Sequence, residues 1–228
     1  MKKGTFLIGV FVLTLSFSAC QNRSSEMKVT DSLMDSGITK VDTSSMLANI
    51  DTNSMVSDMG RTMEKMIEKI HQFKMTGNIE FDLASLMKFH HQAAIDMSKL
   101  ELELGTEPRQ KQIAKNIIGK QTKEIQLLDD LLKNTPKTKN YEPSDKKTGL
   151  GRDINKNMAQ MMNMDDISSG TPDHEFTNRM IKHHKDGIDM GKIILKYSQL
   201  EKFKAMTKTM IADQTNEITE LEKTIEHH

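Results

Sequence analysis

Hydrophobic residues recur at every third or fourth position from about residue 55 onward, as they do along one face of an α-helix. Met55, Met59, Met63, Met66 and Ile70 begin this pattern. Gly, Pro and short polar segments interrupt it, and the interruptions predict further helices over about 81–104, 108–133, 153–164, 173–197 and 199–226. The pattern therefore predicts an all-α fold.

The helical pattern contains an internal repeat. A shift of the chain by 93 residues superimposes two helices without a gap. Met87, His90, His91, Ile95, Asp96 and Met97 fall on Met180, His183, His184, Ile188, Asp189 and Met190, and Ile118, Gln121, Thr122, Glu124, Ile125 and Leu128 fall on Ile211, Gln214, Thr215, Glu217, Ile218 and Leu221. The repeated unit is a helical hairpin preceded by a shorter Met-bearing helix, and two such units predict one pseudo-symmetric bundle or two adjoining bundles.

The N-terminus has the features of an export signal. Lys2 and Lys3 precede an apolar stretch over residues 4–17, which is too short to span a bilayer comfortably. The small residues Ser18 and Ala19 then precede Cys20, and this arrangement resembles the lipobox of bacterial lipoproteins. The alternatives are an ordinary secretory signal with an incidental Cys, or an uncleaved anchor helix. We expect lipidation of Cys20, which would anchor an exported protein to a membrane of the bacterial cell envelope.

These features divide the chain into five parts. They are a lipoprotein signal peptide (1–20), a flexible tether rich in Ser, Thr, Asp and Lys (21–50), a first helical repeat (51–134), a linker with Pro and Gly (135–152) and a second helical repeat (153–228).

Composition adds one unusual feature. The 228 residues include 19 Met but a single Cys and no Trp, and aromatic residues make up 4%. Lys+Arg and Asp+Glu both number 32, so no general attraction to nucleic acid is predicted. Because Met is both a flexible core residue and a soft thioether ligand, its excess has two alternative causes, core packing and metal binding.

The repeated helix carries the candidate chemistry. At about 100° per residue, Met87, His90, His91, Ala94 and Met97 share one face, and Ala94 leaves space at its centre. Asp96 points the opposite way, toward solvent. The second copy repeats this arrangement with Gly187 at the small position. Thioethers and imidazoles together favour Cu(I), with Ag(I) as a soft mimic, and thioethers do not oxidise as readily as free thiols outside the cytoplasm.

The predicted metal ligands are therefore Met87, His90, His91, Met97, Met180, His183, His184 and Met190. Further Met clusters precede each hairpin and could add thioethers or simply seal the bundle: Met63, Met66, Met158, Met161, Met162 and Met164. On the second helix of each hairpin, polar residues share a face with aliphatic ones. Gln121 and Glu124, and likewise Gln214 and Glu217, are expected to orient the histidines from behind.

The quoted residues also resemble a known family. Its pattern is Asp-x-x-Phe-x-x-x-Met-Ile-x-His-His, then Ile-x-Met and Ile-x-x-Gln-x-x-Glu-Ile, and the second repeat matches it at Asp173, Phe176, Met180, Ile181, His183, His184, Ile188, Met190, Ile211, Gln214, Glu217 and Ile218. The family is a ferritin-like "domain of unknown function" group of exported bacterial proteins that includes the copper-binding CopM proteins. The resemblance implies a ferritin-like four-helix bundle and copper or silver binding. Leu128 and Leu131, and Leu221 and Thr224, stand where members often carry Met and Trp.

The leading hypothesis is an envelope lipoprotein, not an enzyme, that sequesters Cu(I) or transfers it to a metal-exchange partner of unknown identity. One alternative is a non-catalytic interaction protein that grips partners with Met-rich helical faces. A ferritin-like di-iron oxidase needs two Glu-x-x-His motifs, whereas only residues 68–71, from Glu68 to His71, fit that pattern.

Overall fold

The computed structural model describes residues 52–163 and 170–225, and within these ranges every regular element is an α-helix. The predicted signal peptide, the tether, Cys20 and Met164 lie outside the described residues. The all-α prediction is confirmed for the described part of the chain. None of the helices described there is both long and apolar enough to cross a membrane.

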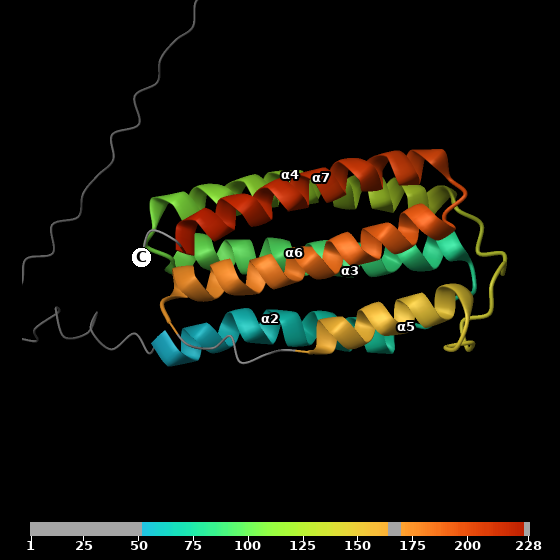
Figure 1. Ribbon diagram of the computed structural model, residues 1–228, viewed down its shortest axis with the longest axis horizontal. Coiled ribbons are helices and arrows are strands. Elements are labelled where there is room, and N and C mark those ends of the chain that lie inside the picture. Colours follow the sequence, from blue (N-terminus) through green and yellow to red (C-terminus); the bar gives the residue numbers. More distant parts are fainter. Residues whose placement is uncertain (1–51, 164–169, 226–228) are drawn as a thin grey trace, which may run out of the picture. The chain divides into compact units, whose positions relative to one another are not determined.

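The helices follow the repeat. The first unit contains α2 (Thr52–Gln72), α3 (Ile79–Leu104) and α4 (Pro108–Asn134), and the second contains α5 (Gly149–Met162), α6 (Pro172–Tyr197) and α7 (Glu201–Ile225). The hairpins α3–α4 and α6–α7 pack together through α3 against α6 and α4 against α7. They form a single four-helix bundle, so the two repeats share one core. Figure 1 shows α4 and α7 on one side of this bundle, with α2 and α5 along the opposite side.

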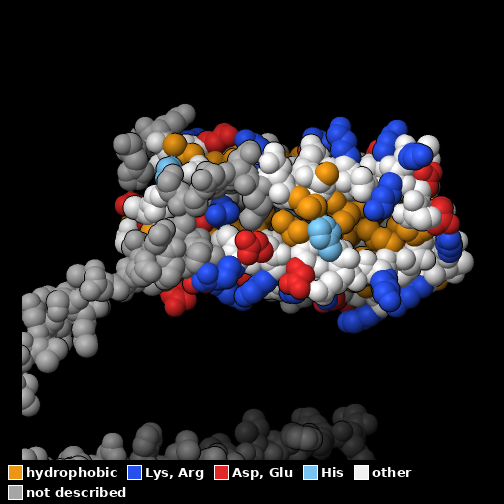
Figure 2. All heavy atoms as spheres, turned by 90° about the horizontal axis from the view of Figure 1, so that it is seen from below, with side chains coloured by type: hydrophobic (Ala, Val, Ile, Leu, Met, Phe, Trp, Pro, Cys, Tyr) orange, Lys and Arg blue, Asp and Glu red, His pale blue; other side chains and the backbone are white. Residues whose placement is uncertain are grey.

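The shorter helices seal the bundle with apolar side chains. Met59, Met63 and Met66 from α2 and Met161 from α5 are all 2% exposed or less. Figure 2 shows the outer face on this side, where hydrophobic side chains gather between charged ones. The buried surface of α2 and α5 therefore continues the core of the four central helices.

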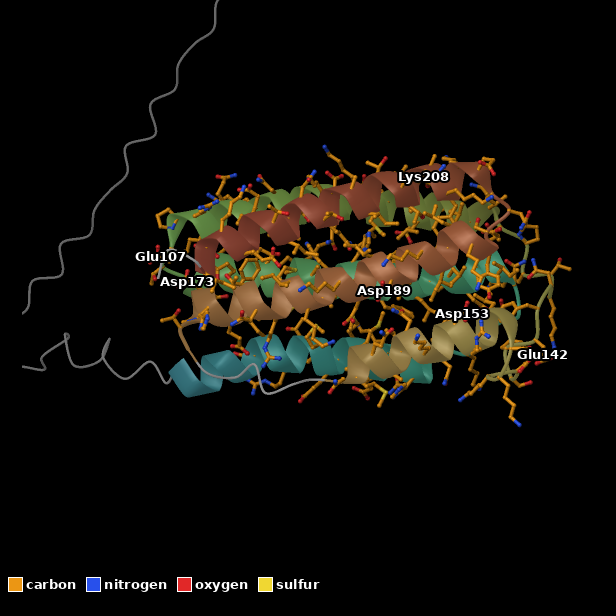
Figure 3. All side chains as sticks on the ribbon, in the orientation of Figure 1. Glu107, Glu142, Asp153, Asp173, Asp189 and Lys208 are labelled. Atoms are coloured by element: carbon orange, nitrogen blue, oxygen red, sulfur yellow. The ribbon has the colours of Figure 1, made fainter. Side chains whose placement is uncertain are left out.

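The two hairpins cap one another with carboxylates that are 93 residues apart. Asp173, in the first turn of α6, accepts hydrogen bonds from the backbone amides of Thr106 and Glu107, in the turn between α3 and α4. Glu107 and Asp173 lie at the same end of the bundle in Figure 3. Glu80, in the first turn of α3, accepts from the Ser198 hydroxyl and the Gln199 amide, between α6 and α7. Each repeat thus satisfies the exposed backbone donors of the other.

The start of α5 differs from the prediction. The helix begins at Gly149, whereas the sequence predicted a linker up to residue 152. Gly149 and Gly151 belong to the Pro- and Gly-containing segment that predicts the linker. A Cβ at Gly151 would lie 2.1 Å from the carbonyl oxygen of Asp145, so this glycine allows two backbone segments to approach inside a helix that has already begun.

The segment before α5 is anchored to the start of α3. The amides of Asn140 and Tyr141 donate to the carbonyl of Gly77, whose φ of 86° favours glycine. The Tyr141 hydroxyl donates to Asp82. Residues 138–141 therefore pack against the first hairpin.

Candidate metal centre

Two histidines from different repeats meet at the centre of the bundle. His90 on α3 and His183 on α6 stack with ring centroids 3.6 Å apart and planes inclined by 14°. Both side chains are fully buried. Burial, followed by the neighbouring histidines, holds the pKa of each well below its usual value. Both imidazoles are therefore neutral near pH 7, as metal-binding imidazoles must be.

The hydrogen bonds of the stack define which nitrogen is free. His183 Nε2 lies 3.1 Å from the carbonyl oxygen of His90 and donates to it. The lone pair of a neutral His183 then lies on Nδ1, which has no hydrogen-bond partner, and neither ring nitrogen of His90 has one. Unpartnered buried nitrogens are costly unless they bind something else.

The other histidine of each pair faces the second helix of its own hairpin. His184 Nε2 donates to Glu217 Oε2 at 2.9 Å, and His91 Nε2 lies 2.8 Å from Glu124 Oε2. Both rings are fully buried, and Nδ1 of each has no hydrogen-bond partner. The structure therefore brings Glu124 and Glu217 to the histidines that they are expected to orient, and the Nδ1 atoms are left for a ligand.

Close packing around Gly187, the small residue of the second repeat, leaves no room for a larger side chain. A Cβ on Gly187 would lie 2.6 Å from Gln214 Oε1 and 2.7 Å from His90 Cε1. The side-chain amides of Gln214 and Gln121 are buried, and neither has a hydrogen-bond partner. Gln214 therefore lies beside the histidine stack, where its amide is available to a bound ion or water.

The predicted sulfur ligands are buried on the same helices. Met87, Met97 and Met180 are fully buried and Met190 is 2% exposed. Of the further methionines, Met63, Met66 and Met161 are buried, whereas Met158 is half-buried. Met162 is 51% exposed and does not line the interior. The methionines of α3 and α6 are thus buried on the same helices as the four histidines, within a core that also contains Met63, Met66, Met161 and Met210.

In the described residues, no three His, Cys, Asp or Glu side chains converge as a metal-binding group. Glu68 and His71, the residues of the Glu-x-x-His motif, are exposed on α2 and lie outside the bundle interior.

One pair close to the centre was not predicted from the sequence. Lys120 Nζ lies 2.8 Å from Asp213 Oδ1 and 3.0 Å from Glu217 Oε1. Burial alone would raise the pKa of Glu217, but the bonds from His184 and then Lys120 hold it below its usual value. Lys120 and Asp213 occupy equivalent positions in the two repeats, so their spacing of 93 was the signal that could have revealed the pair.

Comparison with known proteins agrees with the repeat. The model of a family described as "Domain of unknown function (DUF305)" matches residues 21–132 and residues 80–225. The solved structure "CopM in the Ag-bound form (by soaking)" is similar, with a TM-score of 0.50 and 21% identity over 66% of this chain and 97% of that chain. "CopM in the Cu(I)-bound form" has a TM-score of 0.49 and 22% identity over the same shares. No curated protein matches the sequence.

Proposed function

Because the chain belongs to the DUF305 family, whose model matches both repeats, we propose that it binds soft monovalent metal ions, Cu(I) or Ag(I), in the interior of its bundle. The observation that carries the proposal is the set of buried imidazole nitrogens without hydrogen-bond partners on His90, His91, His183 and His184. Imidazole and thioether are the ligands that soft ions prefer, and both are buried on α3 and α6. The similar CopM structure with bound Ag supports the same choice of metal.

The donors fall into two half-sites, one in each repeat. We group them by repeat: the first half-site comprises Met87, His90, His91 and Met97, with Glu124 behind His91, and the second comprises Met180, His183, His184 and Met190, with Glu217 behind His184. The lone pair of an imidazole lies in the ring plane. Since His90 and His183 stack nearly parallel, their lone pairs point side by side and not toward one shared point between the rings. Each half-site therefore holds an ion of its own.

The residues around the histidines determine which ring nitrogen is available to bind a metal ion. Glu217 accepts the Nε2 proton of His184, which leaves Nδ1 as the donor atom, and Glu124 is placed to do the same for His91. Burial keeps His90 and His183 neutral and excludes water from the ions. A Cu(I) ion bound among these groups would be shielded from oxidants and from exchange with solvent.

We place this protein in the bacterial cell envelope, anchored by a lipid on Cys20, where it would sequester Cu(I) or pass it to another protein without catalysing a reaction. The Lys2-Lys3 start, the short apolar stretch and the small residues before Cys20 support this location. Few described methionines are left to form a partner-gripping surface, since Met59, Met63, Met87, Met97 and Met180 are at most 1% exposed. Metal binding therefore gives these buried methionines a role, whereas the interaction hypothesis requires methionines at the surface.

Titration of the mature chain with Cu(I) tests the proposal. The measurement is competition against a chromophoric Cu(I) chelator under reducing conditions, with Zn(II) as a borderline ion for comparison. Combined His90→Ala, His91→Ala, His183→Ala and His184→Ala substitutions should weaken Cu(I) binding by at least about 100-fold, since each step removes a ligand worth a few kcal/mol.

The matched control is His71→Ala with His174→Ala, which removes two exposed imidazoles. This control should retain wild-type affinity for Cu(I). The proposal fails if the quadruple variant, shown to be folded by circular dichroism, binds Cu(I) as tightly as the wild-type chain, or if the wild-type chain prefers Zn(II).

A further inference from the structure

The two half-sites differ in the ion pairs that their carboxylates, Glu124 and Glu217, form. Glu217 is paired with Lys120, whose ammonium lies 3.0 Å from Oε1. By the repeat, the position equivalent to Lys120 is Asp213, so Glu124 has no ammonium at the corresponding place. His91 is the one ion-pair partner of Glu124 in the described part of the chain. Lys120 also pairs with Asp213 at 2.8 Å, so the half-sites do not differ by a full charge. They differ in that both carboxylate oxygens of Glu217 are engaged, by Lys120 and His184, whereas only Oε2 of Glu124 has an ion-pair partner among the described residues.

A surface groove leads to the first half-site. It lies between α4 and α7, has a volume of about 360 Å³, and is lined by Glu124, Leu127, Leu131, Lys202, Phe203 and Met206, among others. Glu124 both lines this groove and lies 2.8 Å from the buried His91. It thus connects the surface with the interior. Lys202 also lines the groove, is exposed, and forms no ion pair with Glu124 in the described part of the chain.

Met206 gives the groove a soft ligand. Its side chain is half-buried, and it lines the groove together with Glu124. A Cu(I) ion that leaves water needs a thioether or imidazole to replace its hydration, and Met206 offers one before the ion reaches His91. The groove therefore contains a soft ligand and a carboxylate on the way to a free imidazole nitrogen.

The equivalent surface of the second repeat is built differently. Ile113 stands at the position equivalent to Met206, and Glu220 at the position equivalent to Leu127. Glu220 pairs with Arg109 across α4 and α7 at 3.4 Å. The second half-site thus has an ion pair between its helices where the first has an apolar groove with a thioether.

We propose that soft metal ions enter the bundle through the groove of Glu124 and Met206, and that the first half-site fills before the second. This inference rests on the proposed function. A cation that approaches Glu217 meets a carboxylate that Lys120 and His184 already engage, whereas Oε1 of Glu124 has no ion-pair partner in the described part of the chain and can attract the cation. Met206 is accordingly an entry ligand.

Stepwise addition of Ag(I) to the mature chain, followed by NMR of the imidazole nitrogens, tests the order of filling. The first equivalent should shift the His90 and His91 signals, and the second those of His183 and His184. Lys120→Met should reduce the difference in affinity between the half-sites by about tenfold, because it removes the repelling ammonium. Equal filling, or filling of the second half-site first, overturns the inference while the proposed function stands. Failure to bind Ag(I) or Cu(I) at all overturns both.

Stopped-flow transfer of Cu(I) from a chromophoric chelator tests the route. Met206→Leu keeps the apolar volume and removes the sulfur, so it should slow the first phase by about tenfold, with a smaller change in equilibrium affinity. Met75→Leu is the matched control, because Met75 is also half-buried but lines a different cavity, with Phe73 and Tyr141. The entry route is wrong if Met206→Leu takes up Cu(I) at the wild-type rate, or if the control slows it equally.

Discussion

The two repeats are alike at the buried centre of the bundle and differ where their contact is partly exposed. At the centre, His90 and His183 occupy equivalent positions and stack directly on one another. Farther out, the equivalent positions hold Lys120 and Asp213, which are opposite in charge and pair with each other. Where the two repeats pack together, some residues contact the equivalent residue of the other repeat. Identical neutral rings can stack there, whereas a charged residue needs an opposite charge, which requires the repeats to diverge.

The ends of the hairpins show the same contrast. Glu80 and Asp173 are equivalent and perform the same capping role for the opposite hairpin. Glu101, by contrast, is a buried carboxyl beside Asp173, and the equivalent residue is the buried Ile194. Substitutions at such paired positions can show which parts of the repeat are interchangeable.

The largest effect is expected at the caps. Asp173→Ala leaves the amides of Thr106 and Glu107 without their acceptor, and should cost about 2–3 kcal/mol of unfolding free energy. Glu80→Ala removes one amide bond and one hydroxyl bond, and should cost about 1–2 kcal/mol. Urea denaturation measures both, with the exposed Glu64→Ala as control. If both variants have the same free energy of unfolding as the control, the hydrogen bonds of these caps between the repeats do not stabilise the fold.

A pH-dependent effect of about 2 kcal/mol is expected at Glu101. Burial, followed by the charge of Asp173, raises the pKa of Glu101 to about 9. The native state keeps a proton that the unfolded chain releases above its ordinary pKa of 4.5. The stabilisation is therefore complete below pH 4.5 and is lost as the pH rises through about 9.

Glu101→Gln mimics the protonated carboxyl and should remove this dependence. We expect the variant to match the wild-type chain at pH 5 and to be more stable by about 2 kcal/mol at pH 8, measured by urea denaturation across pH. Parallel stability curves for the two proteins would show that Glu101 is ionised in the native state.

A smaller effect is expected at the small residues beside the histidines. Gly187→Ala should cost about 1–2 kcal/mol, because the new methyl displaces Gln214 and His90 and this outweighs the better helix propensity of Ala. Ala94→Gly, at the equivalent position, should cost about 1 kcal/mol through lost helix propensity. Thermal unfolding compares the two. A Gly187→Ala chain more stable than the wild type would contradict the close packing.

The repeat made much of the fold predictable. Its register placed both His pairs on helices with matching partners, and the helical period located α3, α4, α6 and α7 to within about two residues. The pattern could not decide between one bundle and two, because that depends on how α3 packs against α6, which is a long-range contact. The start of α5 was missed because Gly149 and Gly151 have a packing role that a sequence motif does not distinguish from helix termination.

The surroundings of the histidines were only partly predictable. Glu124 and Glu217 share a face with aliphatic residues, so their position near His91 and His184 followed from amphipathicity. Lys120 could not be assigned in this way, because it is 42% exposed and resembles any surface lysine until the second repeat brings Asp213 beside it. Met206 could not be singled out from the sequence, because the groove that it lines forms only when α4 and α7 come together.

The reciprocal caps also determine when the chain can fold during synthesis. The Asp173 carboxylate closes the turn at Thr106 and Glu107 but follows Glu107 by 66 residues, so a nascent chain that ends before it leaves that turn open. A protein destined for translocation across a membrane must stay unfolded until it has crossed. If this chain is exported as we propose, a first hairpin that closes only with the second would delay closure of the bundle until nearly the whole polypeptide has emerged on the far side.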